Sequence, residues 1–403
     1  MHKRSREHHA TNARAVRAHQ PPRSEQWQGL TAREILDRHP AGKTSPMRVL
    51  EILIGLFNHQ HTAKQKEVSF KTRQERAQFL RRFFHDLRKA GFKNLPDPRN
   101  LGGRHVTAML AIWREERLAA STIQTYLSFL RGFAQWIKKP GLIRRLEQYG
   151  FKPEEYERHE AADRDKSWSA RGIEIDAMLK SIDEYDRYVG AAMRLMHALG
   201  LRKKEAIMLR PHKCVLPFEA TGLPLHKKKA EGYLHVANGS KGGRERFIPL
   251  ELPERIAAIE HAQTVVPIHD GHMGRPSHSL KQAMRRFDSV MKKFGITKKQ
   301  LGVTSHGLRH EMLIDQFERL TGELPPVRGG AKLPAEIDTA ARQEVAELAG
   351  HARKRASNAY LGGVRVRQRD AMDVQAVRSE PPSLPRTPIV VDTEIDLVTR
   401  PGD

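Results

Sequence analysis

Residues 304–313 read TSHGLRHEML, and this segment says more about the fold than any other part of the chain. Thr304 or Ser305 can cap a helix, and His306 and Arg309 then lie one turn apart on the same helical face. The N-terminal end of a helix attracts anions, and an arginine can donate two parallel hydrogen bonds to a phosphate. The segment therefore predicts a phosphate pocket, although an HxxR pattern alone has low specificity.

His310 follows Arg309 directly and raises the question of a histidine metal pair. No HExxH pattern or carboxylate cluster accompanies it, and the single cysteine, Cys214, excludes a multi-cysteine zinc site and an internal disulfide. We expect no bound metal and a cytoplasmic protein.

Upstream, residues 197–209 read HALGLRKKEAIML. Gly200 is expected to end one helix, and Arg202 to open the next with its charge available to a phosphate. Glu205, three residues on, can hold this guanidinium in place. Taken alone, a surface Arg–Glu pair is the simpler interpretation.

Residues 233–250, YLHVANGSKGGRERFIPL, predict a β-hairpin with a glycine-rich turn around Lys241. A lysine on such a turn can swing in and protonate a leaving oxygen. Arg244, just after the turn, is a candidate DNA contact. The GxxxxGK[ST] spacing of a P-loop is absent, and a basic hairpin tip without a catalytic role is the simpler interpretation of this segment alone.

Downstream, residues 345–363 read VAELAGHARKRASNAYLGG. Gly350 is expected to end a helix before His351, and Tyr360 follows nine residues later. At about 100° per residue, one straight helix would place these two side chains on opposite faces. A break between them is needed if both serve one site; otherwise Tyr360 is an ordinary buried tyrosine.

The N-terminal half is helical by its apolar spacing over residues 47–57, 71–92, 105–118 and 121–141. In the last segment Ser121 or Thr122 is the expected N-cap, and a stripe from Ile123 to Ile137 forms the core. The candidate DNA contacts lie on the remaining faces of the second and fourth segments; they are Arg73, Arg76, Arg82, Thr125, Ser128, Arg131 and Gln135. A merely solvated charged face is the alternative.

Charge and composition point to nucleic acid. The 403 residues contain 71 Lys and Arg against 47 Asp and Glu, a formal charge of +24. No apolar run is long enough to span a bilayer and no signal-peptide stretch is present, so we expect no membrane association. Few aromatic residues favour contacts to phosphates over base stacking.

Length and composition divide the chain into a basic arm that we expect to be disordered, two domains, a linker and a tail. The arm covers residues 1–44, a helical DNA-binding domain 45–151, a linker 152–167, a mostly helical catalytic domain with a small sheet 168–363, and the tail 364–403. The fold class is mainly α (α+β).

Six residues of the second half occur in the order and local contexts of one family: Arg202 in GLRxxE, Lys241 in GSKGGRER, His306 and Arg309 in HGLRH, and His351 and Tyr360 in AGH…Y. The chain resembles the tyrosine recombinase, or phage integrase, family from about Met47 to Tyr360. The resemblance implies a SAM-like helical core-binding domain followed by a catalytic domain. AGH in place of the more usual LGH is a conservative departure. A longer segment around 321–340 is another, which could touch DNA or a neighbouring subunit but is more simply a solvated loop.

The resemblance also implies the chemistry. Arg202 and Arg309 would clamp the scissile phosphate, and Tyr360 would attack it to form a 3′-phosphotyrosyl intermediate. His306 would help the phenol lose its proton, His351 would hydrogen-bond the phosphate, and Lys241 would protonate the departing 5′ oxygen. No cofactor, ATP or metal is required.

The implied partners are double-stranded recombination sites and three further copies of the chain, because exchange between two duplexes needs four cuts. Accessory DNA-bending or directionality proteins are further candidates, and the element moved would be a phage or integrative element. The apolar patch PIVVDTEIDLV at 388–398 could dock on a neighbouring copy. The alternatives are a non-cleaving regulator with a recombinase fold and a monomeric relaxer of the type IB topoisomerase kind.

Overall fold

The computed structural model describes residues 27, 29–61, 67–158, 160–240 and 243–363. The chain forms two compact units, unit 1 (Met1–Arg158) and unit 2 (His159–Asp403), each with its own hydrophobic core. None of the helices described in these ranges is long and apolar enough to cross a membrane. The predicted tail, with its patch at 388–398, lies outside the described residues.

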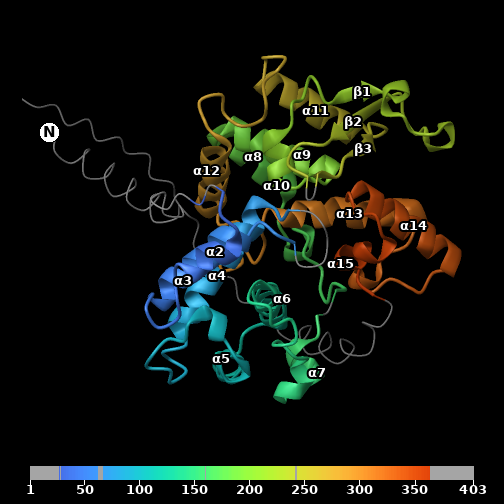
Figure 1. Cartoon of the computed structure of the whole chain (residues 1–403). Coiled ribbons are helices and arrows are strands. Elements are labelled where there is room, and N and C mark those ends of the chain that lie inside the picture. Colours follow the sequence, from blue (N-terminus) through green and yellow to red (C-terminus); the bar gives the residue numbers. More distant parts are fainter. Residues whose placement is uncertain (1–26, 28, 62–66, 159, 241–242, 364–403) are drawn as a thin grey trace, which may run out of the picture. The chain divides into compact units, whose positions relative to one another are not determined.

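Unit 1 is helical in its described part (Figure 1). Its core is rich in aromatic rings: Phe79 stacks on Tyr126 with ring centroids 4.5 Å apart and also contacts Trp113. Ile123, Leu127, Leu130 and Ala134 of the predicted stripe are buried. The α-helices are α2 (Ala32–Asp37), α3 (Pro46–Phe57), α4 (Phe70–Asp86), α5 (Gly103–Glu115), α6 (Ala120–Trp136) and α7 (Pro153–Tyr156).

Two predictions for unit 1 are wrong, one about where its structured part begins and one about the N-cap of α6. The predicted arm 1–44 includes α2, which begins with a capping box between Thr31 and Glu34 and buries Ile35. A structured segment therefore begins before residue 45, because these local hydrogen bonds and one apolar contact hold a helix too short to show periodicity. Helix α6 starts at Ala120 after Ala119, so neither predicted N-cap residue caps it.

The predicted linker 152–167 contains structure at both ends. Its first part forms α7, where the backbone carbonyl of Tyr156 accepts a hydrogen bond from Gln124 of α6. Its last part belongs to unit 2, where the amide of Ala162 donates to the carbonyl of Asn358 at 2.7 Å. Although this segment has few apolar residues, its backbone forms hydrogen bonds that hold it to both units' described residues.

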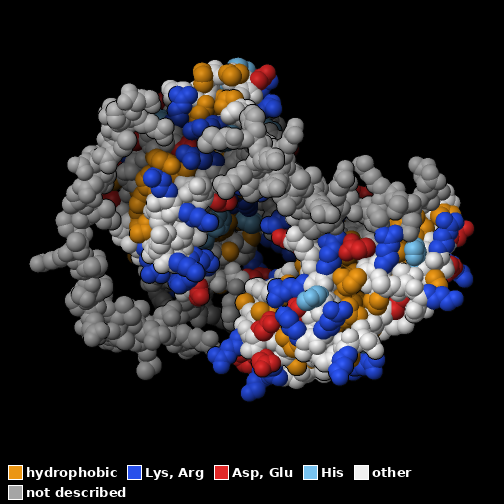
Figure 2. Space-filling model, turned by 90° about the vertical axis from the view of Figure 1, so that its left-hand side faces the viewer, with side chains coloured by type: hydrophobic (Ala, Val, Ile, Leu, Met, Phe, Trp, Pro, Cys, Tyr) orange, Lys and Arg blue, Asp and Glu red, His pale blue; other side chains and the backbone are white. Residues whose placement is uncertain are grey.

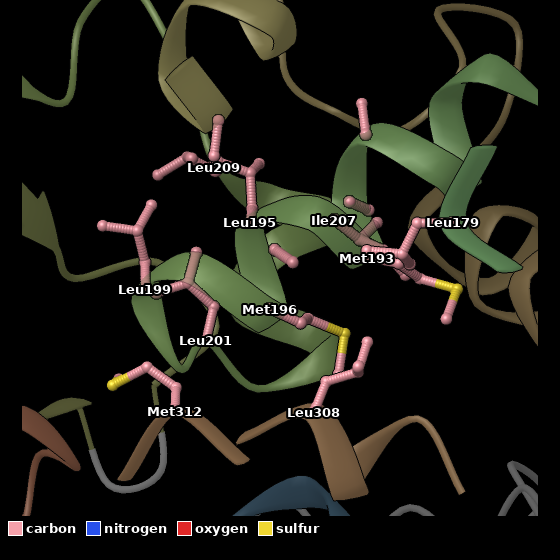
Figure 3. Packing of buried hydrophobic residues seen from close by; sticks show 14 of the residues in the cluster. Leu179, Met193, Leu195, Met196, Leu199, Leu201, Ile207, Leu209, Leu308 and Met312 are labelled. Atoms are coloured by element: carbon pink, nitrogen blue, oxygen red, sulfur yellow. The ribbon is translucent and has the colours of Figure 1, made fainter. Parts of the chain in front are cut away.

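Helix α9 (Arg187–Leu199) lies at the centre of unit 2 and packs against several neighbouring helices. Figure 3 shows Leu195, Met196, Leu199 and Leu201 with Met312 of α13 among the packed side chains. Tertiary burial of this kind stabilises helices far more than propensity does. The α-helices are α8 (Ile175–Tyr185), α9 (Arg187–Leu199), α10 (Lys203–Met208), α11 (Pro253–Val265), α12 (Leu280–Lys293), α13 (His306–Thr321), α14 (Ala335–Leu348) and α15 (Asn358–Leu361).

A three-stranded antiparallel sheet in the order β1-β2-β3 is inserted between α10 and α11. The predicted hairpin is confirmed as β2 (Gly232–Val236) and β3 (Arg246–Pro249), with Leu234 opposite Ile248. The sequence patterns did not indicate β1 (Val215–Pro217), which pairs with β2 over three residues. The predicted fold class, mainly helical with a small antiparallel sheet, is confirmed.

The segment 321–340 is folded onto unit 2 and is not simply a solvated loop. Arg328 donates to Asp165 at 2.8 Å and to Glu311 of α13 at 3.1 Å. Glu311 also accepts from the amides of Trp168 and Ser169. One arginine of this segment thus ties the start of unit 2 to α13.

Candidate active site

Arg202 is fixed at the junction of two helices. Helix α9 ends at Leu199, Gly200 turns the chain with φ of 59°, and Arg202 is the N-cap of α10. The predicted contact with Glu205 is present: Nη1 of Arg202 donates to the carboxylate at 2.6 Å. Only glycine takes this left-handed backbone easily, so the turn at Gly200 sets the direction in which Arg202 points.

Glu205 is shared with a second arginine that the sequence interpretation missed. Arg246 of β3, 7% exposed, donates two hydrogen bonds to Glu205, at 2.8 and 3.2 Å. Burial alone would raise the pKa of Glu205, but hydrogen bonds from Arg246 and the charge of Arg202 lower it to about 2. This carboxylate therefore stays ionised and orients both guanidinium groups. The ERF context of Arg246 carries no signal of this distant pairing.

Arg309 is completely buried on the first turn of α13. It donates to the carbonyl oxygens of Gly200 and Ala349, the latter at 2.5 Å, and its Nε donates to the Tyr360 hydroxyl at 3.1 Å. Burial lowers the pKa of Arg309 to about 10, so the group remains charged at neutral pH. Arg202 donates to the same Ala349 carbonyl at 3.0 Å, which brings the two arginines together.

Tyr360 reaches this group because the helix before it is broken, as predicted. Helix α14 ends at Leu348, Gly350 has φ of 67°, and a separate short helix, α15, carries the tyrosine. The Tyr360 hydroxyl lies 3.5 Å from Nε2 of His351, and that nitrogen lies 3.5 Å from Nη2 of Arg202. The phenol is 5% exposed. Hydrogen-bonding contacts thus link Arg202, Arg309, His351 and Tyr360, whereas His306 meets Tyr360 in a ring contact.

Two histidines of α13 flank the phenol. The rings of His306 and His310 lie 6.3 and 4.9 Å from the Tyr360 ring. Desolvation and then the charge of Arg309 lower the pKa of His306 to about 4. Both causes favour the neutral ring, which keeps part of its surface exposed to solvent. Burial lowers the pKa of His310 to about 3. Ser305 stands at the N-cap of α13 without a side-chain capping bond, contrary to expectation.

Lys241 lies outside the described residues, but the base of its turn does not. A side chain at Gly239 would meet the carbonyl oxygen of Lys204 at 2.8 Å and the amide of Glu205 at 3.0 Å. Gly239, where the turn begins, is therefore packed directly against the first turn of α10. Across the residues that the structure describes, no group of three or more His, Cys, Asp and Glu side chains could hold a metal ion.

Among the candidate DNA contacts on α4, the prediction for Arg76 is wrong, because this side chain is buried. Its side chain is 2% exposed and donates to the side chain and the carbonyl of Asn58, at 2.7 and 2.6 Å. Asn58 is eighteen residues away, so sequence periodicity could not show this contact. Arg73 is ion-paired with Glu67, whereas Arg82 is 64% exposed and 3.3 Å from Asp86.

The candidates on α6 share one side of the helix. Ser128 and Gln135 are exposed and Arg131 is half-buried, while Thr125 donates to the Ser121 carbonyl and accepts from Arg158. Arg244 is exposed beside the hairpin turn of unit 2. Figure 2 shows Lys and Arg side chains spread over the visible face, interspersed with acidic ones.

Some solved structures are similar to the chain. A lambda integrase dimer bound to a COC' core site is 14% identical, with a TM-score of 0.49, and the match covers 88% of this chain and 87% of that one. A Tn1549 transposon integrase in complex with circular intermediate DNA is 14% identical (TM-score 0.47; 82% and 99% covered). XerH recombinase bound to difH is also 14% identical (TM-score 0.45; 87% and 90% covered). A search of curated proteins finds no match.

Two family models match the sequence, one in each unit. The model described as phage integrase, N-terminal, matches residues 58–140, and the model described as integrase matches residues 163–315. The second match contains Arg202, Lys241 and the His306–Arg309 pair, and ends before His351 and Tyr360. Because the solved structures have low identities and scores, the assignment depends on these two models and on the residues gathered around Tyr360. The chain belongs to the phage integrase family of tyrosine recombinases, enzymes that break and rejoin DNA strands.

Proposed function

We propose that this chain cleaves double-stranded DNA at a recombination site through Tyr360 and rejoins the strand to a new partner. The hydrogen bond from Arg309 to the Tyr360 hydroxyl, 3.1 Å long, is the observation that carries the proposal. It places a fixed cation at the oxygen that would become the nucleophile.

In the proposed first step the Tyr360 oxygen attacks phosphorus and the bond from phosphorus to the 5′ oxygen breaks. The phenolic proton passes to a neutral base, for which His306 is the candidate because its ring lies beside that of Tyr360 and its lowered pKa leaves it unprotonated at neutral pH. Lys241 supplies a proton to the departing 5′ oxygen. Arg202, Arg309 and His351 donate hydrogen bonds to the negative oxygens of the transition state.

The second step reverses the first with a different 5′-hydroxyl. Because the phosphotyrosyl bond conserves the energy of the broken phosphodiester, rejoining requires no nucleotide and no metal. We assign catalysis to unit 2 and DNA binding to unit 1, with Arg82, Ser128, Arg131 and Gln135 as candidate contacts. We further propose a tetramer on two paired sites in the bacterial cytoplasm, which moves a phage or integrative element with or without accessory DNA-bending proteins.

The test is a nicked suicide substrate that carries the ends of the mobile element, incubated with wild-type protein and with Tyr360→Phe. The short fragment that carries the new 5′-hydroxyl diffuses away after cleavage, so a covalent protein–DNA adduct accumulates. We expect an adduct with the wild type and none with Tyr360→Phe, whose DNA affinity should be unchanged. Absence of an adduct with the wild type, together with normal binding, would favour a non-cleaving regulator.

A further inference from the structure

A cavity of about 330 Å³ lies beside His306 in unit 2. The segment before α8 forms one wall, and the loop between α12 and α13 forms the other. The side chains of His306 and His310 line it, so it lies next to the histidines that flank Tyr360. The lining residues that matter here are Arg164, Lys166, Arg171, Lys298, His306 and His310.

The cavity carries unbalanced positive charge. In the part of the chain that the structure describes, Arg164, Arg171 and Lys298 have no ion-pair partner. The ammonium of Lys166 lies 3.9 Å from the carboxylate of Asp163, which makes a long ion pair. Asp165 also lines the cavity, but its carboxylate accepts from Arg328 at 2.8 Å. Four cations around one hollow, with their only lining acid engaged elsewhere, form a site for an anion.

His310, which lines the cavity, has a buried nitrogen without a partner in the described part of the chain. His310 is 6% exposed, and within the described residues its Nδ1 has no hydrogen-bond partner. Leaving a buried polar atom unpaired costs about 1–3 kcal/mol, so such an atom in a native structure calls for an explanation. In the neutral ring Nδ1 can carry a hydrogen and donate it to an anion.

We propose that this cavity binds a DNA backbone phosphate that neighbours the scissile phosphate. Lys298, Arg171 and Arg164 supply the charge, and His310 donates from Nδ1. The start of α13 lies at the same wall and adds its favourable dipole. The inference rests on the proposed function, since it takes DNA as the source of the phosphate. It gives His310 a contact of its own, distinct from the group around Arg309.

The test measures how DNA affinity depends on salt, using the full-length chain and a random-sequence duplex of about 30 base pairs. Each phosphate neutralised contributes about 0.9 to the slope of log Kobs against log salt concentration. The double variant Arg171→Ala/Lys298→Ala should lower this slope by about 1 and weaken binding at moderate salt. Lys180→Ala/Lys299→Ala removes two exposed lysines outside the cavity and should change neither slope nor affinity by comparison.

A second arm uses His310→Phe, which keeps a ring of similar size but removes Nδ1. It should weaken DNA binding in the wild-type background and have little further effect in the Arg171→Ala/Lys298→Ala background. Equal slopes and affinities for the wild type and both double variants would overturn the cavity as a DNA site. Tight binding of inorganic phosphate at constant ionic strength, with an unchanged DNA slope, would overturn it in favour of a free anion.

Failure of the proposed function would look different. If the wild type forms no suicide-substrate adduct while the slopes still differ, cleavage is refuted and the phosphate contact stands. If the adduct forms and the slopes agree, the phosphate contact is refuted and cleavage stands.

Discussion

At the scale of single residues, the most unusual environment belongs to the histidines of α13. His310 is buried between the rings of His306 and Tyr360, with Arg309 and Lys166 among the cations around it and Asp165 as an opposing charge. Its pKa falls from 6.5 to about 3, so the ring is neutral throughout the physiological range. A neutral ring beside the phenol adds no positive charge that would repel the two arginines.

This environment predicts a pH-dependent stability. Below pH 6.5 the unfolded chain takes up a proton at His310, whereas the folded protein does not until about pH 3. Stability is therefore fully present above pH 6.5 and falls with decreasing pH, by about 1.4 kcal/mol per pH unit for this histidine. Between pH 7.5 and 5.0, urea unfolding should show the wild type losing about 2 kcal/mol more than His310→Phe.

The exposed His226 provides the control for that experiment. His226→Phe should follow the wild-type pH profile. Parallel profiles for the wild type and His310→Phe would show that His310 is protonated alike in the folded and unfolded states, contrary to its burial.

At the scale of elements, the turn of the hairpin approaches α10 closely at one glycine. Gly239 has φ of 81°, and an added Cβ would lie 2.8 Å from the Lys204 carbonyl oxygen. Gly222 has φ of 68° and nothing within 4 Å of its Cβ position. The two glycines share the left-handed backbone, and only Gly239 is in close contact.

Comparing alanine variants at Gly239 and Gly222 distinguishes the effect of backbone strain, which both variants have, from displacement of the turn, which only Gly239→Ala causes. Both variants should lose about 1–2 kcal/mol of unfolding free energy, because alanine disfavours a left-handed backbone. Only Gly239→Ala should also slow adduct formation, by about 10-fold or more, since the turn that carries Lys241 must shift away from α10. A 5′-bridging phosphorothiolate, whose thiolate leaves without a proton, should restore its rate. Equal rates for the two variants would contradict this account.

Sequence patterns predicted the elements whose signals are local. The β-runs of 233–250 gave the hairpin, and the helical angle between His351 and Tyr360 gave the break that separates α14 from α15. Features set by distant contacts were missed: Arg76 is buried by Asn58, and Arg246 by Glu205. Arg76 was expected on an open helix face, as most charged residues are, and Arg246 was assigned no role. In both cases the partner lies far along the chain, where local patterns carry no signal.

At the scale of the whole molecule, Arg328 connects segments that are far apart in the sequence. It joins Asp165, at the start of unit 2, to Glu311 in α13, and both carboxylates are largely shielded from solvent. The neighbouring segment also contacts the tyrosine helix, since the Gly362 Cβ position lies 3.1 Å from the Val327 amide. The extra length at 321–340 thus braces the surroundings of Tyr360.

Removing this brace should destabilise the protein. Arg328→Gln leaves two shielded carboxylates without their cation, and we expect a loss of about 2–3 kcal/mol in unfolding free energy. Arg319→Gln breaks an exposed pair with Glu254 and should change stability by less than about 1 kcal/mol. Thermal or urea unfolding of both variants checks this; equal small effects would show that the segment contributes little to unit 2.

The contacts of Arg309 also fix its remaining hydrogen-bonding capacity. A guanidinium has five N–H hydrogens, and Arg309 directs three of them, one each from Nε, Nη1 and Nη2, at Tyr360, Gly200 and Ala349. One hydrogen is left on each Nη atom, which equals the number of non-bridging oxygens on a phosphodiester. The arginine therefore keeps two N–H groups for a phosphate without releasing either carbonyl. Because Arg309 is completely buried, the side chains that cover it must move aside before DNA can reach these groups.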